Sequence, residues 1–449
     1  MQVLVINNLP HYILMMKLLV QTIKINNIQF GDNTELKGGV LHINKADILA
    51  FAEQEPCFET LKIDIARPGE SVRIINVVDV IQPRCKMSGN ADWPGVLTDQ
   101  CEIAGSGVTR ALEGVGITLC QNNTYWSRKW GSFDMSGECA GINPYAKMPQ
   151  LVIEPIAPDG ADFREYREAV RRVGYKTAVM LAKASLGVKA DSEELFDNET
   201  QYPELPGIAY SFQFYSKQYD TQNYREPMFY GTAVPDSFPL VMQPTEILDG
   251  AISLCGGFRC LTTYEIQNHP VILELMRRHG KDLNFSGVIA TVNSVEAKHR
   301  ILVSKMAAVL LKETLKADGL IVTKGVGGAS TLCVGAIASE AEKLGIKSVP
   351  IIQILNGKSN LGVECLISES NINSIVCSGT YYHNYNLPPV DTLLGGPQDA
   401  LYLSGDDGVI EGHRIASGKP AKGQINSTYM KQVGLMSQVG YSHGKAVDY

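Results

Sequence analysis

The chain has 449 residues, of which 45% are hydrophobic and 19% are charged, and its formal net charge is −7. This length exceeds what one hydrophobic core usually contains, so we expect two or three domains. The negative charge argues against nucleic acid or an anionic membrane as a main partner, and no run of about twenty apolar residues predicts a membrane span.

Ten cysteines are spread along the chain without a CxxC pair, and the eight histidines show no HxxxH or HExxH spacing. We therefore expect no metal site. Residues 1–16 are apolar but lack the basic segment and the small-residue cleavage site of a secretory signal. This predicts a reducing, cytoplasmic location without structural disulfides. Met15 and Met16 are candidate start residues, because strand-like sequence begins directly after them.

The N-terminal part, to about residue 155, is expected to be mainly β. Short apolar runs between turn residues predict strands over 18–28, 40–43, 61–65, 71–80 and 151–153, the last ending before Pro155. A helix is predicted over 45–52, with Asn44 as its N-cap.

A long amphipathic helix is predicted over 162–186, with an acidic start that suits the helix dipole. Residues 187–207 are acidic and contain proline, which predicts a loop or linker. Two further strands are predicted over 207–214 and 229–234, before residue 245.

The C-terminal part alternates strands and helices. Strands are predicted over 287–292, 319–323, 348–355 and 374–377, and helices over 295–316 and 330–344, the second ending at Gly345. This alternation predicts a parallel sheet with helices on both faces. From about residue 400 the sequence is rich in glycine and polar residues, which suggests a swinging arm or an interface segment.

The expected fold class is therefore α/β: a mainly β N-terminal domain followed by a parallel-sheet α/β domain. We expect a mixed β/α domain over 17–245 and a segment around a cysteine pair over 246–264. An α/β domain over 265–400 and a tail over 401–449 would follow.

A glycine-rich loop at 324–330 follows a predicted strand and begins a predicted helix. Backbone N–H groups at a helix start attract anions, so Gly327, Gly328 and Ser330 are candidates to bind a substrate carboxylate or a phosphate. A plain tight turn is the alternative. The match to a dinucleotide-binding fingerprint is poor, so neither a nicotinamide nor a flavin is expected.

Arg67 and Arg73 flank the turn at 68–69. A guanidinium forms two parallel hydrogen bonds with a carboxylate, so either residue is a candidate to bind a substrate carboxylate. A surface ion pair with Glu70 is the alternative.

The segment TEILDGAISLCGGFRCLTTY, residues 245–264, carries Cys255, followed by two glycines, and Cys260. Glycine permits backbone conformations that other residues avoid, and in such a turn a cysteine thiol can attack the carbonyl before it. The thioester formed can break by elimination, which cuts the chain and leaves a pyruvoyl group at the new N-terminus. Buried thiols, a redox pair or half of a metal site are the alternatives.

Three polar residues follow the cysteine pair. The hydroxyls of Thr262 and Thr263 are candidates to polarise the carbonyl at the cleavage site, as oxyanion donors do. His269, at the start of a helix predicted over 270–278, is a candidate to move protons. The alternatives are a strand start for the threonines and a capping or packing role for the histidine.

The order of motifs resembles the substrate-binding proprotein subunit of component B of the glycine/sarcosine/betaine reductases. The blocks that carry this resemblance lie at 28–34, 65–74, 80–84, 105–110, 134–137, 268–272 and 278–285. So many blocks in the same order are not expected in an unrelated fold.

The resemblance implies cleavage at a mid-chain cysteine that becomes a pyruvoyl residue. By its position after 249–252 this residue is Cys255, with Cys260 as the second choice. The first domain would belong to the beta subunit and the α/β domain to the alpha subunit. The pyruvoyl carbonyl would form a Schiff base with a small amine substrate, so that a partner selenolate or thiolate can cleave the C–N bond reductively.

The resemblance also implies partners. They are a selenocysteine- or cysteine-containing subunit of the same component, a small selenoprotein carrier and a component that releases acetyl phosphate, with disulfide or thioredoxin-type electron donors. The activity would be that of an oxidoreductase. Glycine, sarcosine, betaine and a ring amine of the D-proline type all remain possible substrates.

Two other classes of function stay open. Leu254 stands where the glycine-type subunit has asparagine, which favours an uncleaved paralogue that acts as a scaffold of a complex. The other class is a thiol redox protein that uses Cys255 and Cys260, which the absence of a CxxC pair disfavours.

Overall fold

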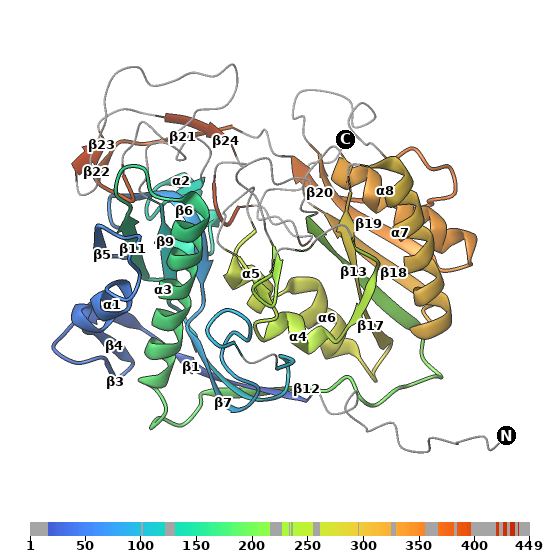
Figure 1. Ribbon diagram of the computed structural model, residues 1–449, viewed down its shortest axis with the longest axis horizontal. Helices are drawn as coiled ribbons and strands as arrows, with labels where there is room; N and C mark the ends of the chain where they lie inside the picture. Colours follow the sequence, from blue (N-terminus) through green and yellow to red (C-terminus); the bar gives the residue numbers. More distant parts are fainter. Residues whose placement is uncertain are drawn as a thin grey trace.

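The structure is a computed structural model that describes residues 17–99, 102–121, 131–215, 227–232, 234, 237–254, 261–294, 296–324, 329–354, 367–380, 384–396, 419–421, 425–428, 432–435 and 439. In these residues the expected α/β fold class is confirmed. A β-rich part lies beside a mostly parallel sheet with its own helices (Figure 1). None of the described helices is long and apolar enough to cross a membrane.

The β-rich part contains two main sheets and a smaller one. The first is ordered β12 (Ser192–Phe196), β1 (Leu18–Lys24), β8 (Gly107–Glu113) and β7 (Arg84–Gly89). The second is ordered β23 (Lys419–Ala421), β22 (Val390–Leu394), β6 (Val72–Ile81), β9 (Gly116–Cys120), β11 (Gln150–Ile156) and β5 (Thr60–Ala66), with β10 (Gly131–Asp134) beside β6. The small sheet is formed by β2 (Asn27–Phe30), β4 (Val40–Ile43) and β3 (Glu35–Lys37), followed by helix α1 (Lys45–Ala52).

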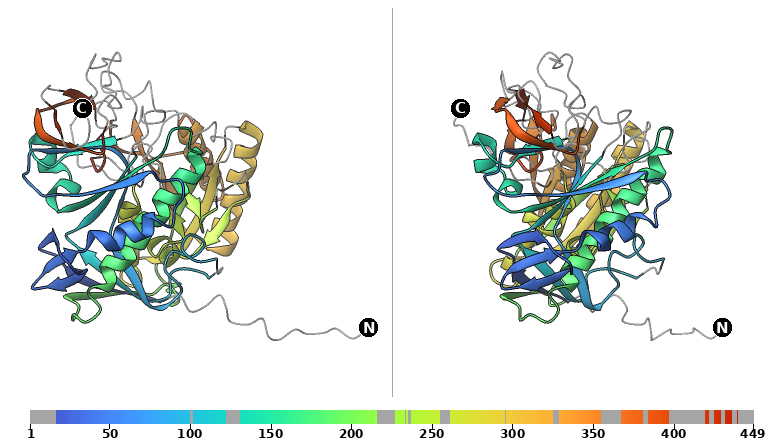
Figure 2. Two further views of the ribbon diagram at one scale, coloured as in Figure 1. Left: turned by 60° about the vertical axis from the view of Figure 1, so that its left-hand side comes forward. Right: turned by 90° about the vertical axis from the view of Figure 1, so that its left-hand side faces the viewer.

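Helix α3 (Phe163–Lys183) packs against the β-rich part next to α1 (Figure 2). Asp162 is its N-cap, and the carboxylate accepts two backbone N–H groups of the first turn, so the predicted helix is confirmed. Apolar side chains such as Val170 enter the core beneath it. A Cβ atom on Gly174 would lie 2.5 Å from Leu119 Cδ1, so this side chain of β9 packs directly on the helix backbone.

The second part is a six-stranded sheet in which every neighbouring pair is parallel except the pair at one edge. Its order is β15 (Leu240–Met242), β17 (Asn284–Asn293), β13 (Gly207–Tyr215), β18 (Gly319–Lys324), β19 (Lys347–Ile354) and β20 (Val376–Thr380). Helices α7 (Ala297–Val309) and α8 (Ala329–Lys343) cover one face, and α4 (Pro244–Leu248), α5 (Thr263–Gln267) and α6 (Pro270–Arg278) lie between the other face and the β-rich part (Figure 1). The predicted parallel sheet with helices on both faces is confirmed.

Segments from both halves of the sequence are interleaved. β13 precedes the cysteine pair, yet it lies between β17 and β18, which both follow it. In the other direction, β22 pairs with β6 in the β-rich part, where the last strands of the chain are coloured red in Figures 1 and 2. In the described tail, Val433 packs into the same core as Phe133 and Tyr145.

Several predicted elements need correction. The strand predicted to end before Pro155 continues to Ile156, because pairing with β9 stops at Ile153 and leaves the strand a free side where proline fits. The loop predicted over 187–207 contains β12, whose acidic residues pair with β1 instead of filling a core. The strand predicted over 229–234 ends at Phe229.

The reason for that early end is the backbone of Tyr230, whose φ of 45° turns the chain out of the strand. The strand predicted over 18–28 is divided into β1 and β2, and the helix predicted over 295–316 changes to a π-helical turn at Leu310–Thr314. By contrast, α1 with its Asn44 cap, the strand at Val40–Ile43 and the glycine after α8, with φ of 79°, are confirmed.

A buried ion pair joins two strands of the β-rich part, β6 and β10. Arg73 Nε and Nη2 donate to the two carboxylate oxygens of Asp134 at 2.7 and 2.8 Å, and both side chains are at most 1% exposed. Arg73 Nη2 also donates to the carbonyl of Pro388 at 2.6 Å, which ties β6 to the chain just before β22.

We expect Arg73→Met to lower the free energy of unfolding by about 3–5 kcal/mol, because Asp134 would remain buried without its partner. Urea unfolding followed by circular dichroism measures this. The matched control is the double variant Arg73→Met/Asp134→Leu, which removes both charges and should regain most of the loss. A double variant as unstable as the single one would contradict this account of the pair.

Candidate functional site

The residues on both sides of the cysteine pair are described, although Cys255 and Cys260 themselves lie outside the described residues. On the N-terminal side, β16 (Ile252–Ser253) pairs with β14 (Met228–Phe229) and leads directly to Leu254. On the C-terminal side, Leu261 is followed by α5. The structure therefore defines the surroundings of the peptide group that precedes Cys255.

Two side chains of α3 donate hydrogen bonds to the carbonyl of Leu254. Tyr175 Oη donates at 3.0 Å and Arg171 Nε at 3.3 Å. The N–H of Leu254 in turn donates to Tyr175 Oη at 2.9 Å. All three residues are buried, with exposures of 0% for Tyr175, 1% for Arg171 and 2% for Leu254. This carbonyl carbon is the atom that the Cys255 thiol would attack.

Helix geometry and neighbouring side chains fix these two donors. Arg171 and Tyr175 lie one helical turn apart and therefore project from the same face of α3. The ring of Tyr175 stacks on Trp93 with a centroid distance of 3.9 Å and an interplanar angle of 7°. Arg171 Nη1 forms an ion pair with Glu168 at 2.8 Å.

A buried carboxylate, that of Asp79, is linked to the hydroxyl of Tyr175 through Thr263. Asp79, on β6, accepts the N–H of Thr263 at 2.7 Å and its hydroxyl at 2.6 Å, and Thr263 Oγ1 lies 3.1 Å from Tyr175 Oη. Burial, followed by the negative charge of Asp79, raises the pKa of Tyr175 well above its usual range. Tyr175 therefore stays a neutral hydrogen-bond donor at physiological pH.

Thr262 and Thr263 have different positions. Thr262 is the N-cap of α5: its hydroxyl accepts the N–H of Glu265 at 3.2 Å, and the Glu265 carboxylate accepts the N–H of Thr262 at 3.0 Å. Thr263 contacts Tyr175, which contacts the carbonyl of Leu254. Among the described contacts, the side-chain hydrogen bonds to the carbonyl of Leu254 come from Tyr175 and Arg171, and neither threonine contacts it directly.

His269 is fully buried at the start of α6. Its Nδ1 accepts the N–H of Ile272 at 3.4 Å, so the proton is assigned to Nε2, which lies 3.0 Å from Tyr210 Oη. Burial lowers the pKa of His269 to about 3, so the imidazole is neutral at physiological pH. The structure places this residue in the capping position that the sequence offered as an alternative role.

The candidate anion-binding residues lie in three different settings. Arg67 Nη2 donates to the carbonyl of Ile28 at 3.0 Å and its Nη1 pairs with Glu70 at 3.5 Å, whereas Arg73 is held by Asp134. Ser330 is buried at the start of α8, where its hydroxyl accepts a hydrogen bond from Asn293. Gly327 and Gly328 lie outside the described residues.

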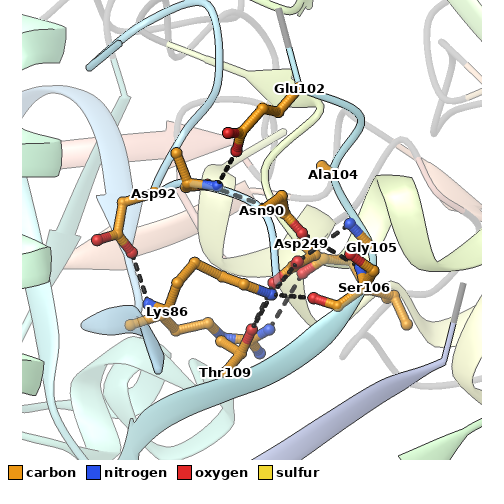
Figure 3. A network of polar contacts seen from close by, with 12 residues as sticks. Lys86, Asn90, Asp92, Glu102, Ala104, Gly105, Ser106, Thr109 and Asp249 are labelled. Atoms are coloured by element: carbon orange, nitrogen blue, oxygen red, sulfur yellow. Dashed lines mark hydrogen bonds and ion pairs between the residues drawn. The ribbon is translucent and has the colours of Figure 1, made fainter. Parts of the chain in front are cut away.

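A second polar network fixes the chain five residues before Leu254 (Figure 3). Asp249 accepts hydrogen bonds from Lys86 Nζ at 2.6 Å, from the N–H of Gly105 at 3.0 Å and from the hydroxyl of Thr109 at 2.6 Å. The side chains of Lys86 and Asp249 are 8% and 2% exposed. Because this network is buried, it holds the start of the 249–254 segment firmly against β7 and β8.

Sequence reasoning missed Arg171, Tyr175, Asp79 and the Lys86–Asp249 pair. One signal was available, since Arg171 and Tyr175 lie one turn apart on the same face of an amphipathic helix as the apolar residue Ala178. Asp79 lies 184 residues from Thr263, and Lys86 lies 163 residues from Asp249, so only the tertiary fold brings these residues together.

The residues around position 255 fit a reaction at a carbonyl group. The side chains that reach the preceding peptide group are donors, and Ser253 Oγ is buried without a hydrogen-bond partner among the described residues. Within the same residues, no cluster of three histidine, cysteine or acidic side chains could bind a metal ion.

Comparison with known proteins gives one consistent result. The family model described as glycine/sarcosine/betaine reductase component B subunits matches residues 16–443. Sarcosine reductase complex component B subunit alpha of Peptoclostridium acidaminophilum is 32% identical over 392 residues, which cover 85% of this chain and 89% of the relative. No solved structure matches the chain.

Two further relatives agree with this result. Glycine reductase complex component B subunits alpha and beta of Acetoanaerobium sticklandii is 30% identical over 451 residues, covering 97% of this chain and 100% of the relative. Betaine reductase complex component B subunit alpha of Peptoclostridium acidaminophilum is 30% identical over 421 residues, covering 89% of this chain and 92% of the relative.

The depressed pKa of His269 predicts a dependence of stability on pH. In the unfolded chain the imidazole binds a proton below about pH 6.5, whereas in the folded protein it stays neutral to about pH 3. The stabilising contribution is therefore complete above pH 6.5 and is lost as the pH falls toward 3. At about pH 5.5 the loss should be roughly 1.4 kcal/mol.

The measurement is thermal unfolding of the wild type and of His269→Asn at about pH 7.5 and about pH 5.5; the variant keeps an N-cap side chain but cannot titrate. The other histidines titrate in both proteins, so the difference between the two profiles isolates His269. Parallel profiles would contradict the prediction.

Proposed function

This chain belongs to the glycine/sarcosine/betaine reductase component B family, and we propose that within this family it is the proprotein of a pyruvoyl-forming, substrate-binding subunit, cut between Leu254 and Cys255. As a family member, it is a subunit of a reductase complex. The observation that carries the proposal is the pair of buried donors, Arg171 and Tyr175, on the carbonyl of Leu254.

The anchoring of both flanks of residues 255–260 also supports cleavage at this place. Tyr175 contacts both Leu254, which precedes this segment, and Thr263, which follows it. A cut between Leu254 and Cys255 would therefore leave one residue bound to Tyr175 on each side of the cut. The glycine reductase relatives carry two subunit names, alpha and beta, for one chain, which agrees with a proprotein.

In the proposed division, residues 17–245 form the body of the beta subunit and residues 265–400 that of the alpha subunit, with 246–264 as the processing segment and 401–449 as the tail. A pyruvoyl group at position 255 supplies an electrophilic carbonyl for the amine of a small substrate. Ser330, with Gly327 and Gly328, is the proposed site for a substrate carboxylate, because it begins α8 at the carboxyl edge of the parallel sheet.

The proposed complex acts in the cytoplasm. Its other members would be a selenocysteine- or cysteine-containing subunit, whose selenolate or thiolate cleaves the C–N bond, a small selenoprotein carrier and a component that releases acetyl phosphate. Disulfide or thioredoxin-type donors would supply the electrons.

Intact mass of protein purified from its native host under reducing conditions tests the proposal. We expect two fragments that together account for the chain, the second beginning at position 255 with a blocked N-terminus. Borohydride with an added amine should increase the mass of this fragment alone, because only an N-terminal carbonyl can be trapped in this way.

Each other outcome has a definite meaning. A blocked start at position 260 would move the assignment to Cys260. A single uncleaved mass from the native host would contradict the proposal and leave a scaffold subunit as the better function.

The interleaved sheet predicts that the two fragments remain together after cleavage. β13 on the first fragment pairs along its whole length with β17 on the second, and β22 on the second pairs with β6 on the first. Cleaved protein should therefore elute from a size-exclusion column as one species and separate only in urea. Fragments that separate in native buffer would contradict this strand order.

A further inference from the structure

The carbonyl of Leu254 receives more hydrogen bonding than a buried carbonyl requires. One partner satisfies such a group, and most obtain it from the backbone of a sheet or helix. Here the partners are the hydroxyl of Tyr175 and the guanidinium of Arg171, a cation that is 1% exposed. Burying a guanidinium is costly, and its ion-pair partner Glu168 has a side chain that is 39% exposed.

We propose that Tyr175 and Arg171 are catalytic residues of chain cleavage: they bind the oxyanion that forms on Leu254 when the thiol of Cys255 attacks. This inference rests on the proposed function and deepens it. Asp79 and Thr263 are positioning residues that fix the hydroxyl of Tyr175.

The step conserves atoms and electrons. Cys255 Sγ gives up its proton and bonds to the carbonyl carbon of Leu254, and the C=O electron pair moves onto oxygen. When the carbonyl re-forms, the C–N bond breaks and the nitrogen of Cys255 takes a proton, which leaves a thioester. Loss of the Cα proton then breaks the Cβ–S bond, which releases a thiocarboxylate on Leu254 and forms a Cα=Cβ double bond at position 255. A proton added to Cβ converts this enamine to an imine, water hydrolyses the imine to the pyruvoyl carbonyl, and ammonia leaves, so no oxidant is needed.

The two donors are suited to the charge that develops in the first step. A guanidinium stays cationic, and a neutral buried phenol donates without losing its proton. Their ground-state distances of 3.3 and 3.0 Å are long for bonds to a charged oxygen, so both have room to shorten as negative charge forms.

The proton count around Tyr175 explains the role of the positioning residues. The hydroxyl proton of Thr263 is directed to Asp79 at 2.6 Å, so toward Tyr175 this oxygen can only accept. The N–H of Leu254 also points at Tyr175 Oη. Tyr175 thus has one hydroxyl proton and two possible acceptors, the oxygens of Leu254 and Thr263. The Leu254 oxygen becomes the stronger acceptor as it becomes an anion.

The experiment follows cleavage of the full chain after cell-free synthesis, by intact mass over time. Tyr175→Phe and Arg171→Met should each slow cleavage about 10²-fold, the usual effect of losing one oxyanion donor. Arg171→Lys keeps the charge and should be faster than Arg171→Met. Cys255→Ala should not be cleaved at all.

The matched control is Tyr166→Phe. Tyr166 is a buried tyrosine of the same helix whose hydroxyl donates to the carbonyl of Pro155 at 2.7 Å, away from the cleavage site. Its loss should lower stability but leave the cleavage rate at the wild-type value. Thermal unfolding of each uncleaved variant separates a slow reaction from a failure to fold.

Hydroxylamine identifies the blocked step, because it cuts a thioester and leaves a hydroxamate on Leu254. In the slow variants we expect little hydroxamate, since the thioester itself forms slowly. Folded Tyr175→Phe and Arg171→Met chains that cleave at the wild-type rate, or that accumulate thioester, would overturn the proposal while leaving the proposed function intact.

If Tyr175→Phe fails to fold, the comparison of Arg171→Lys with Arg171→Met decides the question, and equal wild-type rates overturn the proposal. A wild-type chain that never cleaves overturns both the proposed function and this inference.

Discussion

Helix α3 connects the core of the β-rich part with the peptide group that precedes Cys255. Its apolar face belongs to the core of the β-rich part, and the polar side chains of Arg171 and Tyr175 reach out from the same helix to Leu254, beside the parallel sheet. Gly174 lies between them in sequence and packs against the Leu119 side chain of β9, and Val170 and Val173 of the same helix are buried in this core. The position of the Leu254 carbonyl is therefore set by the packing of a distant sheet.

The same segment is restrained a second time. Lys86, Gly105 and Thr109 hold Asp249, and the short pairing of β16 with β14 carries that position forward to Leu254 (Figure 3). A buried ion pair contributes little net stability, but it specifies one arrangement strongly, because every alternative leaves a buried charge without a partner. The geometry before Cys255 is thus defined from both ends of a six-residue stretch.

Sequence patterns were sufficient where local chemistry decides the structure. Helix α1 with Asn44, helix α3 with Asp162 and the alternating strands and helices of the C-terminal half follow from caps and periodicity. They failed where tertiary pairing decides it. β12 is acidic and gains its place from tertiary contacts, above all its pairing with β1. The left-handed backbone of Tyr230 has no sequence signature that distinguishes it from a strand residue.

The site divides in the same way. The position of the cysteine pair and the cap at Thr262 could be predicted from sequence, because both depend on neighbouring residues. The contacts of Leu254 with Arg171 and Tyr175, 83 and 79 residues apart in sequence, could not. Arg73 has the side chain expected for binding a substrate carboxylate, but in the fold its guanidinium binds the carboxylate of Asp134.

The position of β13 at the centre of the parallel sheet has a consequence for biosynthesis. This strand leaves the ribosome well before either of its neighbours, β17 and β18, and until they are made its backbone N–H and C=O groups lack their partner strands. Parallel pairing across such distances also forms late in folding. Two separately translated polypeptides would each expose half of a sheet, whereas a single polypeptide delivers both halves to one folding event at high local concentration.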